Sequence, residues 1–284
     1  MNTRRDLLKY AALGSLFLRP ESLLAKSSKG ASYFKHFIFV NLPGAPSQFE
    51  TFDPKPGVST GGPTKAVRTQ IPGVKFASAL EGLADLSDNM SVLRMTSREG
   101  NHQRAQYFLQ TGGYLPVGVL KHPPMSSLVA WKKEKRKADL PPVISIGNGA
   151  LSAGHLGLKY DPFLISKASS GATNVTLNKY DSTRISKADE IRQQLNKMSP
   201  YYKADEFIQE NDLQQRANRL SLGKAATIFD LKTEKDDIRS QYGETEFSSS
   251  CLLARRLVEA GVPSIQIQLG GWDTHQDNFT RSAS

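Results

Sequence analysis

The most suggestive residues for chemistry are Trp272-Asp273-Thr274-His275, which directly follow an apolar run at residues 264–269. A carboxylate and an imidazole two residues apart can converge on one cation, because their oxygen and nitrogen atoms both suit Zn²⁺, Mn²⁺ or Fe²⁺. The glycines just before them let the backbone turn tightly at the end of a strand. On its own an Asp-x-His pair is a weak signal, so its meaning depends on the neighbouring loops.

A second polar cluster, residues 47–53, follows the first strongly apolar run of the chain. Ser47 and Thr51 offer hydroxyl groups, while Glu50 and Asp53 offer carboxylates that could hold a metal ion. The competing interpretation is structural. The hydroxyl residues could serve in a turn or helix cap, and an aspartate before a proline is common in turns.

The third candidate is His102, in a polar loop that comes after a shorter apolar stretch at residues 91–95. Its alternative role is a hydrogen bond at the start of the following helix. In α/β folds, ligands bind at the carboxyl ends of parallel strands. If the three apolar stretches are parallel strands, we expect the 47–53 cluster, His102 and Asp273 to line one pocket.

The elements that must position these residues alternate between strand and helix patterns, which indicates a three-layer α/β fold with a mainly parallel, doubly wound sheet. We expect the first apolar run to be a buried central strand, because it is nearly continuous. The expected strands are residues 36–42, 91–95, 142–147 and 264–269. The expected helices are residues 77–86, 103–110, 125–137 and 247–260, with further helices between 187 and 242 broken near 199–200 and 223, and with surface loops at 147–185.

The N-terminus has the pattern of a twin-arginine export signal. Arg4 and Arg5 precede a short apolar stretch that ends near Leu18, too short for a stable membrane anchor. Ala25 is a candidate cleavage site, and an uncleaved leader would be the chain's link to the membrane. We therefore expect a signal region at 1–25, a linker at 26–32 and one α/β domain at 33–284 with an insertion at about 147–245. The domain would work in the periplasm or outside the cell, with the export machinery as a partner.

Composition narrows the function further. The net charge of +10 suits an acidic partner, such as a phosphorylated or sulfated molecule. Basic residues are scattered without interleaved aromatic residues, which argues against nucleic-acid binding. Cys251 is the one cysteine, so an internal disulfide and a cysteine-based zinc cluster are both excluded. No apolar run near 18 residues occurs, which excludes a polytopic membrane protein.

Taken together, several segments resemble the family catalogued as domain of unknown function 1501 (DUF1501), whose members are exported by the twin-arginine route. The most specific match is residues 250–262 running into Gly270-Gly271-Trp272-Asp273-Thr274-His275. The other matches are the leader, the segment Pro46 to Pro56, Asn101-His102 with Thr111-Gly112, and Ala153 to Gly157 with Tyr160 to Phe163.

The resemblance implies a branch of the alkaline phosphatase and sulfatase superfamily, and so a hydrolytic site that uses a divalent metal such as Zn, Mn, Ca or Mg. Asp273 and His275 would be metal ligands, and His102 would line the pocket. Ser47 and Thr51 occupy the region where the superfamily keeps its nucleophile and first ligand. The substrate would be a phosphate or sulfate ester.

Two departures from the family pattern weaken this expectation. Gln48 and Glu50 stand where the family usually has a histidine and an aspartate. The family also continues beyond the Asp-Thr-His segment, which suggests that the sheet is incomplete at the C-terminus and this chain is inactive. The alternative is a non-catalytic envelope protein that binds an anionic, for example sulfated, polysaccharide through its basic surface.

Overall fold

The computed structural model describes residues 34–95, 99–115, 118–133, 140–172, 182–222 and 224–281. The expected signal region at 1–25 and linker at 26–32 lie outside the described residues. Residues 1–35 form a unit separate from His36–Ser284, and the fold described below is that of the second unit. No helix in the described ranges is long and apolar enough to cross a membrane.

Four parallel strands form the central sheet, in the order β1-β6-β4-β5. They are β1 (Phe37–Asn41), β4 (Val143–Ile146), β5 (Phe163–Ile165) and β6 (Ser264–Gln268). This confirms the predicted α/β class with a mainly parallel sheet. A separate antiparallel pair joins β2 (Ala66–Arg68) to β3 (Lys75–Ala77).

One face of the sheet is apolar because isoleucines alternate along its central strands. Ile265 and Ile267 of β6 point to this face and are buried. Helix α9 (Glu246–Glu259) covers it and packs Leu253 and Leu257 into the same core cluster. α9 begins after Thr245, whose side chain caps it, and it ends before Gly261, as predicted from the glycine.

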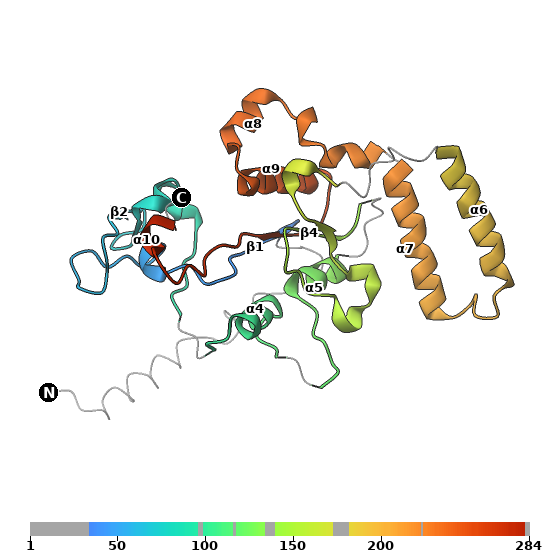
Figure 1. Ribbon diagram of the computed structural model, residues 1–284, viewed down its shortest axis with the longest axis horizontal. Helices are drawn as coiled ribbons and strands as arrows, with labels where there is room; N and C mark the ends of the chain where they lie inside the picture. The colour runs from blue at the N-terminus through green and yellow to red at the C-terminus, as the bar shows by residue number, and fades with distance from the viewer. Residues whose placement is uncertain are drawn as a thin grey trace, which may run out of the picture. The chain divides into compact units, whose positions relative to one another are not determined.

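The opposite face carries buried polar side chains and is covered by α5 (Met125–Lys132), so that helices lie on both sides of the sheet (Figure 1). Here Gln266 of β6 donates a hydrogen bond to Gln110 Oε1 at 2.7 Å. Gln110 is the last residue of α4 (His102–Gln110), which thereby ties the helix that begins at His102 to the middle of the sheet.

The long polar segment between β5 and α9 is helical, as predicted. Helices α6 (Ser182–Met198) and α7 (Asp205–Leu222) run side by side, joined by a turn, and α8 (Asp236–Tyr242) follows (Figure 1). The remaining short helices are α3 (Glu81–Asp85), α10 (Asn278–Arg281) and the 3₁₀ segments η1 (Gln48–Glu50), η2 (Ser78–Leu80), η3 (Ser87–Asn89), η4 (Gly154–Leu156), η5 (Leu158–Tyr160), η6 (Ala168–Ser170), η7 (Lys224–Phe229) and η8 (Leu231–Thr233).

The prediction that residues 36–42 form a central strand was wrong. β1 is an edge strand that pairs with β6 alone within the described sheet. On the face covered by α9, Ile38 and Val40 of β1 remain 46% and 43% exposed. The continuous apolar run therefore does not mark a central strand here. β1 is paired along one edge only, and its apolar side chains are only partly covered.

Two other predictions need correction. Residues 91–95 form no strand, and Arg94 donates to the carbonyl of Phe52 at 2.6 Å. The stretch 147–185 was expected to be surface loop, but it contributes β5 to the sheet. Helix α5 ends at Lys132, and residues 134–137 of the predicted helix 125–137 lie outside the described residues.

Candidate functional site

The loop after β6 presents Asp273 and His275 together at the carboxyl edge of the sheet. The Nε2 atom of His275 lies 2.9 Å from Oδ1 of Asp273, and both side chains are exposed. Between them, Thr274 is buried and its hydroxyl donates to Asn278 Oδ1 at 2.6 Å. Arg281 donates to the Thr274 carbonyl at 3.1 Å, so helix α10 holds the loop in place.

His102 reaches the same carboxylate from a different part of the chain. Its Nε2 atom lies 3.7 Å from Oδ1 of Asp273. His102 is the first residue of α4, whose N-terminus is capped by the Asn101 side chain accepting from the Arg104 amide at 3.0 Å. The cap stabilises the first turn of the helix, which carries His102. The imidazoles of His102 and His275 thus both lie near Oδ1 of Asp273.

The loop after β1 touches the backbone of Asp273. β1 and β6 pair to their ends, where Asn41 faces Gln268. Gly44 then passes so close that a Cβ atom on it would lie 2.5 Å from the Asp273 backbone nitrogen. Gly44 also has a φ of +98°, so both its backbone conformation and this close approach require glycine.

Backbone strain is concentrated in these two loops. Among the residues with described structure, the non-glycine residues with positive φ are Ala45 at 58°, His275 at 54° and Asp277 at 52°. Each such residue costs about 1–3 kcal/mol and persists only where its surroundings hold it, which is characteristic of functional sites. The strain lies beside the Asp273 carboxylate and on one of its two histidines.

The family model described as "Protein of unknown function (DUF1501)" matches residues 34–284. The chain belongs to the DUF1501 family. The match spans the sheet, the loops after β1 and β6, and the start of α4. No curated protein and no solved structure matches the chain.

The two predicted carboxylate ligands of the first loop have their own surroundings in this DUF1501 chain. Asp53 Oδ1 pairs with Arg94 at 2.9 Å and with Lys55 at 2.8 Å. Glu50, the last residue of η1, lines a pocket together with Phe279.

The predicted catalytic hydroxyls occupy the loop after β1. Thr51 donates its hydroxyl to the Ser47 carbonyl at 2.9 Å, which stabilises the η1 turn. Ser47 precedes η1, and its hydroxyl forms no cap hydrogen bond there. In the part of the chain that the structure describes, neither hydroxyl is hydrogen-bonded to Asp273, His275 or His102. The Thr51 hydroxyl is engaged in the turn, whereas the Ser47 hydroxyl does not cap η1.

The donor atoms around Asp273 suit a divalent metal in type and in spacing. Two ligand atoms about 2.1 Å from one ion, at an angle of about 90–110°, lie about 3.0–3.4 Å apart. The observed separations of 2.9 and 3.7 Å from Asp273 Oδ1 bracket that range. The described residues nevertheless contain no group of three or more His, Cys, Asp or Glu side chains that could hold a metal ion as they stand.

Two contacts in this region were not predicted from the sequence. One is the close approach of Gly44 to Asp273, and the other is the ion pair between Arg94 and Asp53. For Gly44, the position directly after a strand and before Ala45-Pro46 is the signal of a tight backbone path. Arg94, expected in a strand, instead neutralises Asp53. An arginine's choice among distant carboxylates has no local sequence signal.

Proposed function

We propose, against the inactivity expected from the sequence, that this DUF1501 chain is a hydrolase of phosphate or sulfate esters that depends on a divalent metal, built on an alkaline phosphatase- and sulfatase-like fold. The observation that supports it is the placement of Asp273 Oδ1 between His275 and His102 at the carboxyl edge of a parallel sheet. Ligand sites of α/β proteins occupy this edge. One carboxylate and two imidazoles are a donor set that zinc and manganese accept.

Asp273, His275 and His102 would hold the metal, which when bound would polarise the ester and favour ionisation of a water or hydroxyl. The chain's own residues supply the positioning. Gly44 fixes the Asp273 backbone by close contact, and Thr274 anchors the loop to α10. Ser47, in the loop after β1, is the hydroxyl we assign to attack on the ester.

The paired arginines of the leader support export of the protein by the twin-arginine route. Substrates of that route cross the membrane folded, which suits a protein that acquires its metal before export. The proposed place of action is therefore the periplasm or the cell exterior, where phosphate and sulfate esters are available to a secreted hydrolase.

The hydrolase proposal is tested with p-nitrophenyl phosphate and p-nitrophenyl sulfate in the presence of zinc, manganese, magnesium or calcium ions. We expect one ester to be hydrolysed and the rate to fall at least about 100-fold in Asp273→Asn, since a metal ligand is lost. The variant His155→Gln changes an exposed histidine outside the three-residue group and should retain full activity. Equal rates for the parent and Asp273→Asn would reject the proposal.

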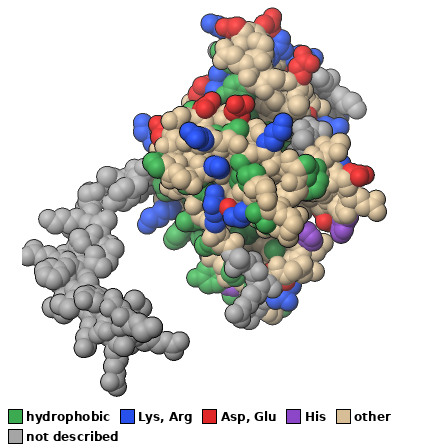
Figure 2. Space-filling view, turned by 90° about the vertical axis from the view of Figure 1, so that its left-hand side faces the viewer, with side chains coloured by type: hydrophobic (Ala, Val, Ile, Leu, Met, Phe, Trp, Pro, Cys, Tyr) green, Lys and Arg blue, Asp and Glu red, His purple; other side chains and the backbone are tan. Residues whose placement is uncertain are grey.

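A second function, non-catalytic binding of an anionic polysaccharide, is favoured by the net charge of +10. Figure 2 shows lysine and arginine side chains across the middle of one face of the molecule. Heparin is a suitable probe: this function predicts retention on a heparin column with elution that depends steeply on salt, and no turnover of either ester. Passage through the column at low salt would exclude it.

A further inference from the structure

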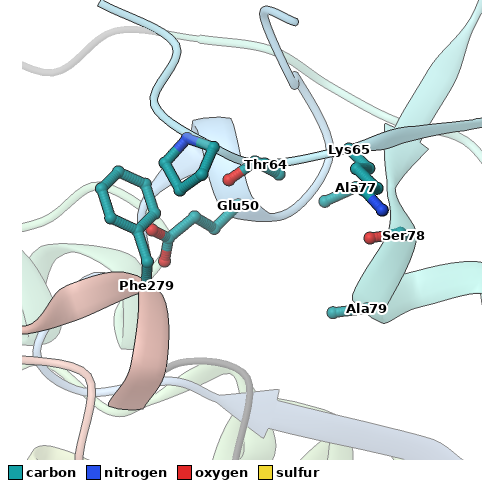
Figure 3. Close-up of a pocket in the computed structure, with 8 residues that line it drawn as sticks. Glu50, Thr64, Lys65, Ala77, Ser78, Ala79 and Phe279 are labelled. Atoms are coloured by element: carbon teal, nitrogen blue, oxygen red, sulfur yellow. The ribbon is translucent and has the colours of Figure 1, made fainter.

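A pocket of about 240 Å³ lies outside the Asp273 group, between the start of β2, the end of β3 and α10. Its polar lining comprises Glu50, Thr64, Lys65 and Ser78, and Phe279 of α10 closes one end (Figure 3). None of its lining residues belongs to the group formed by Asp273, His275 and His102. It is therefore a separate candidate site.

Glu50 is the unusual member of this lining. Its side chain is only 9% exposed, and neither carboxylate oxygen has a hydrogen-bond partner among the described residues. Burying a charged carboxylate without a partner is strongly unfavourable, and proteins normally compensate it with a cation or hydrogen-bond donors. The folded chain thus presents a shielded negative charge whose partner is not one of its own described side chains.

The surroundings of Glu50 suit an organic cation better than a metal ion. Its carboxylate ends beside the Phe279 ring (Figure 3), and an aromatic face attracts an ammonium group. A metal such as calcium needs six to eight oxygen ligands, whereas aromatic and apolar groups form much of this wall. Phe279 is 47% exposed, and the edge of its ring packs on Gly62, where an added Cβ would lie 2.2 Å from Cζ.

The other end of the pocket has the opposite charge. Lys65 and Ser78 lie together there, across the hollow from Glu50 (Figure 3). Lys65 is exposed, and its ammonium forms no ion pair with any residue in the described ranges. With the Ser78 hydroxyl beside it, this end can receive an anionic group such as a carboxylate, sulfonate or phosphate.

We propose that this pocket binds a small zwitterion, with a protonated amine at Glu50 and Phe279 and an anionic group at Lys65 and Ser78. The ligand's ammonium compensates the buried carboxylate, and its apolar stem contacts the ring. This proposal does not depend on the hydrolase function, because the two sites share no residue.

Isothermal titration calorimetry on the full chain tests the pocket with glycine, γ-aminobutyrate and taurine as probes. These compounds differ in length and in the anionic group, so the panel identifies the preferred anion. n-Butylamine and butyrate each carry one of the two charges. We expect at least one zwitterion to bind about tenfold more tightly than either of them, because charge-assisted contacts form at both ends.

Two variants locate the binding. Glu50→Gln keeps the shape of the side chain and should weaken the preferred zwitterion at least about tenfold, while raising the melting temperature of the free protein because the unpaired buried charge is gone. Lys65→Met changes an exposed residue and should weaken the zwitterion without weakening n-butylamine. His155→Gln is the matched control and should bind like the parent.

Several results would overturn the proposal. They are the absence of binding by every zwitterion at millimolar concentration, equal affinity for n-butylamine, unchanged affinity in Glu50→Gln, and Glu50-dependent binding of calcium or magnesium without any zwitterion. Asp273→Asn should lose ester hydrolysis and still bind the zwitterion. Measuring both properties in this variant therefore distinguishes failure of one proposal from failure of the other.

Discussion

Gly44 is the residue through which the loop after β1 fixes the candidate site. It combines a φ of +98° with a backbone contact that leaves no room for a side chain beside Asp273. The loop after β6 therefore depends on Gly44 for its position, although Gly44 itself offers no group to a ligand.

Gly44→Ala should destabilise the fold by about 1–3 kcal/mol and displace Asp273, because a methyl group meets its backbone nitrogen in an unfavourable backbone region. Urea denaturation measures the first effect and metal titration the second. Gly57→Ala is the matched control, since Gly57 has a φ of +79° with nothing within 4 Å of its added Cβ. It should lose stability only through its backbone and leave metal binding unchanged. Equal metal affinity in both variants would contradict the role of Gly44.

Cys251 gives a pH-dependent prediction. Burial in α9 raises the pKa of its thiol. The folded chain therefore holds the thiol proton more tightly than the unfolded chain, and this contribution to stability is present below the ordinary thiol pKa and lost as the pH rises through the raised value. Iodoacetamide should modify the native thiol more slowly than the unfolded one at mildly alkaline pH.

The variant Cys251→Ser supplies the control for that dependence. It removes the titrating thiol, so its urea-unfolding free energy should fall less steeply with alkaline pH than that of the parent. Alkylation of the native thiol as fast as that of the unfolded chain would show that Cys251 is not protected.

The strand pair β1 and β6 shows how the position of an element decides the cost of a substitution. Ile38 and Ile265 face each other in the parallel register, yet Ile265 is fully buried and Ile38 is nearly half exposed. We expect Ile265→Ala to lower the free energy of unfolding by about 2–5 kcal/mol and Ile38→Ala by about 1 kcal/mol. Urea denaturation of both variants measures the difference. Similar losses would mean that β1 is covered on that face.

Elements with their own end signals could be predicted from the sequence. The predicted helix 247–260 and strand 264–269 match α9 and β6 closely, because Thr245, Gly261 and Pro263 mark their boundaries. The polar helices α6 and α7 also follow from their pattern. Capping and turn residues depend on neighbours in the sequence, so their effect does not require contacts with distant parts of the fold.

Elements that depend on a distant partner could not be predicted. Residues 91–95 have the composition of a strand, but Leu93 and Met95 are exposed and no neighbouring strand accepts the segment. β5 is the reverse case: three residues in a turn-rich stretch become a strand because β4 lies alongside. Strand formation is decided by pairing, which lies outside any local window.

The same distinction applies to the candidate site. We expected His102 near Asp273 because residues 91–95 were predicted to be a parallel strand, but no strand forms there. His102 instead comes within 3.7 Å of Asp273 Oδ1 from the first residue of α4, so the rule on which the prediction depended does not explain the contact. The separate environments of Glu50 and Asp53 were not predictable. They follow from the direction of one 3₁₀ turn and from the distant Arg94.

For the molecule as a whole, the fold separates stability from the candidate site. The core lies on the two faces of the sheet, under α9 and α5. Asp273 and His275 are exposed in the loop after β6, and His102 is exposed at the start of α4. Substitutions of these three side chains should therefore change ligand binding with little change in the melting temperature. This separation allows the site to be tested in a folded protein.

The most direct test of the central claim is calorimetric titration of the full metal-free chain with zinc and with manganese. We expect one ion to bind with a stoichiometry near one, and Asp273→Asn, His275→Gln and His102→Gln each to weaken it by about 10–100-fold while His155→Gln does not. Absence of binding by both ions, or unchanged affinity in Asp273→Asn, would contradict the claim that these three side chains form a metal site.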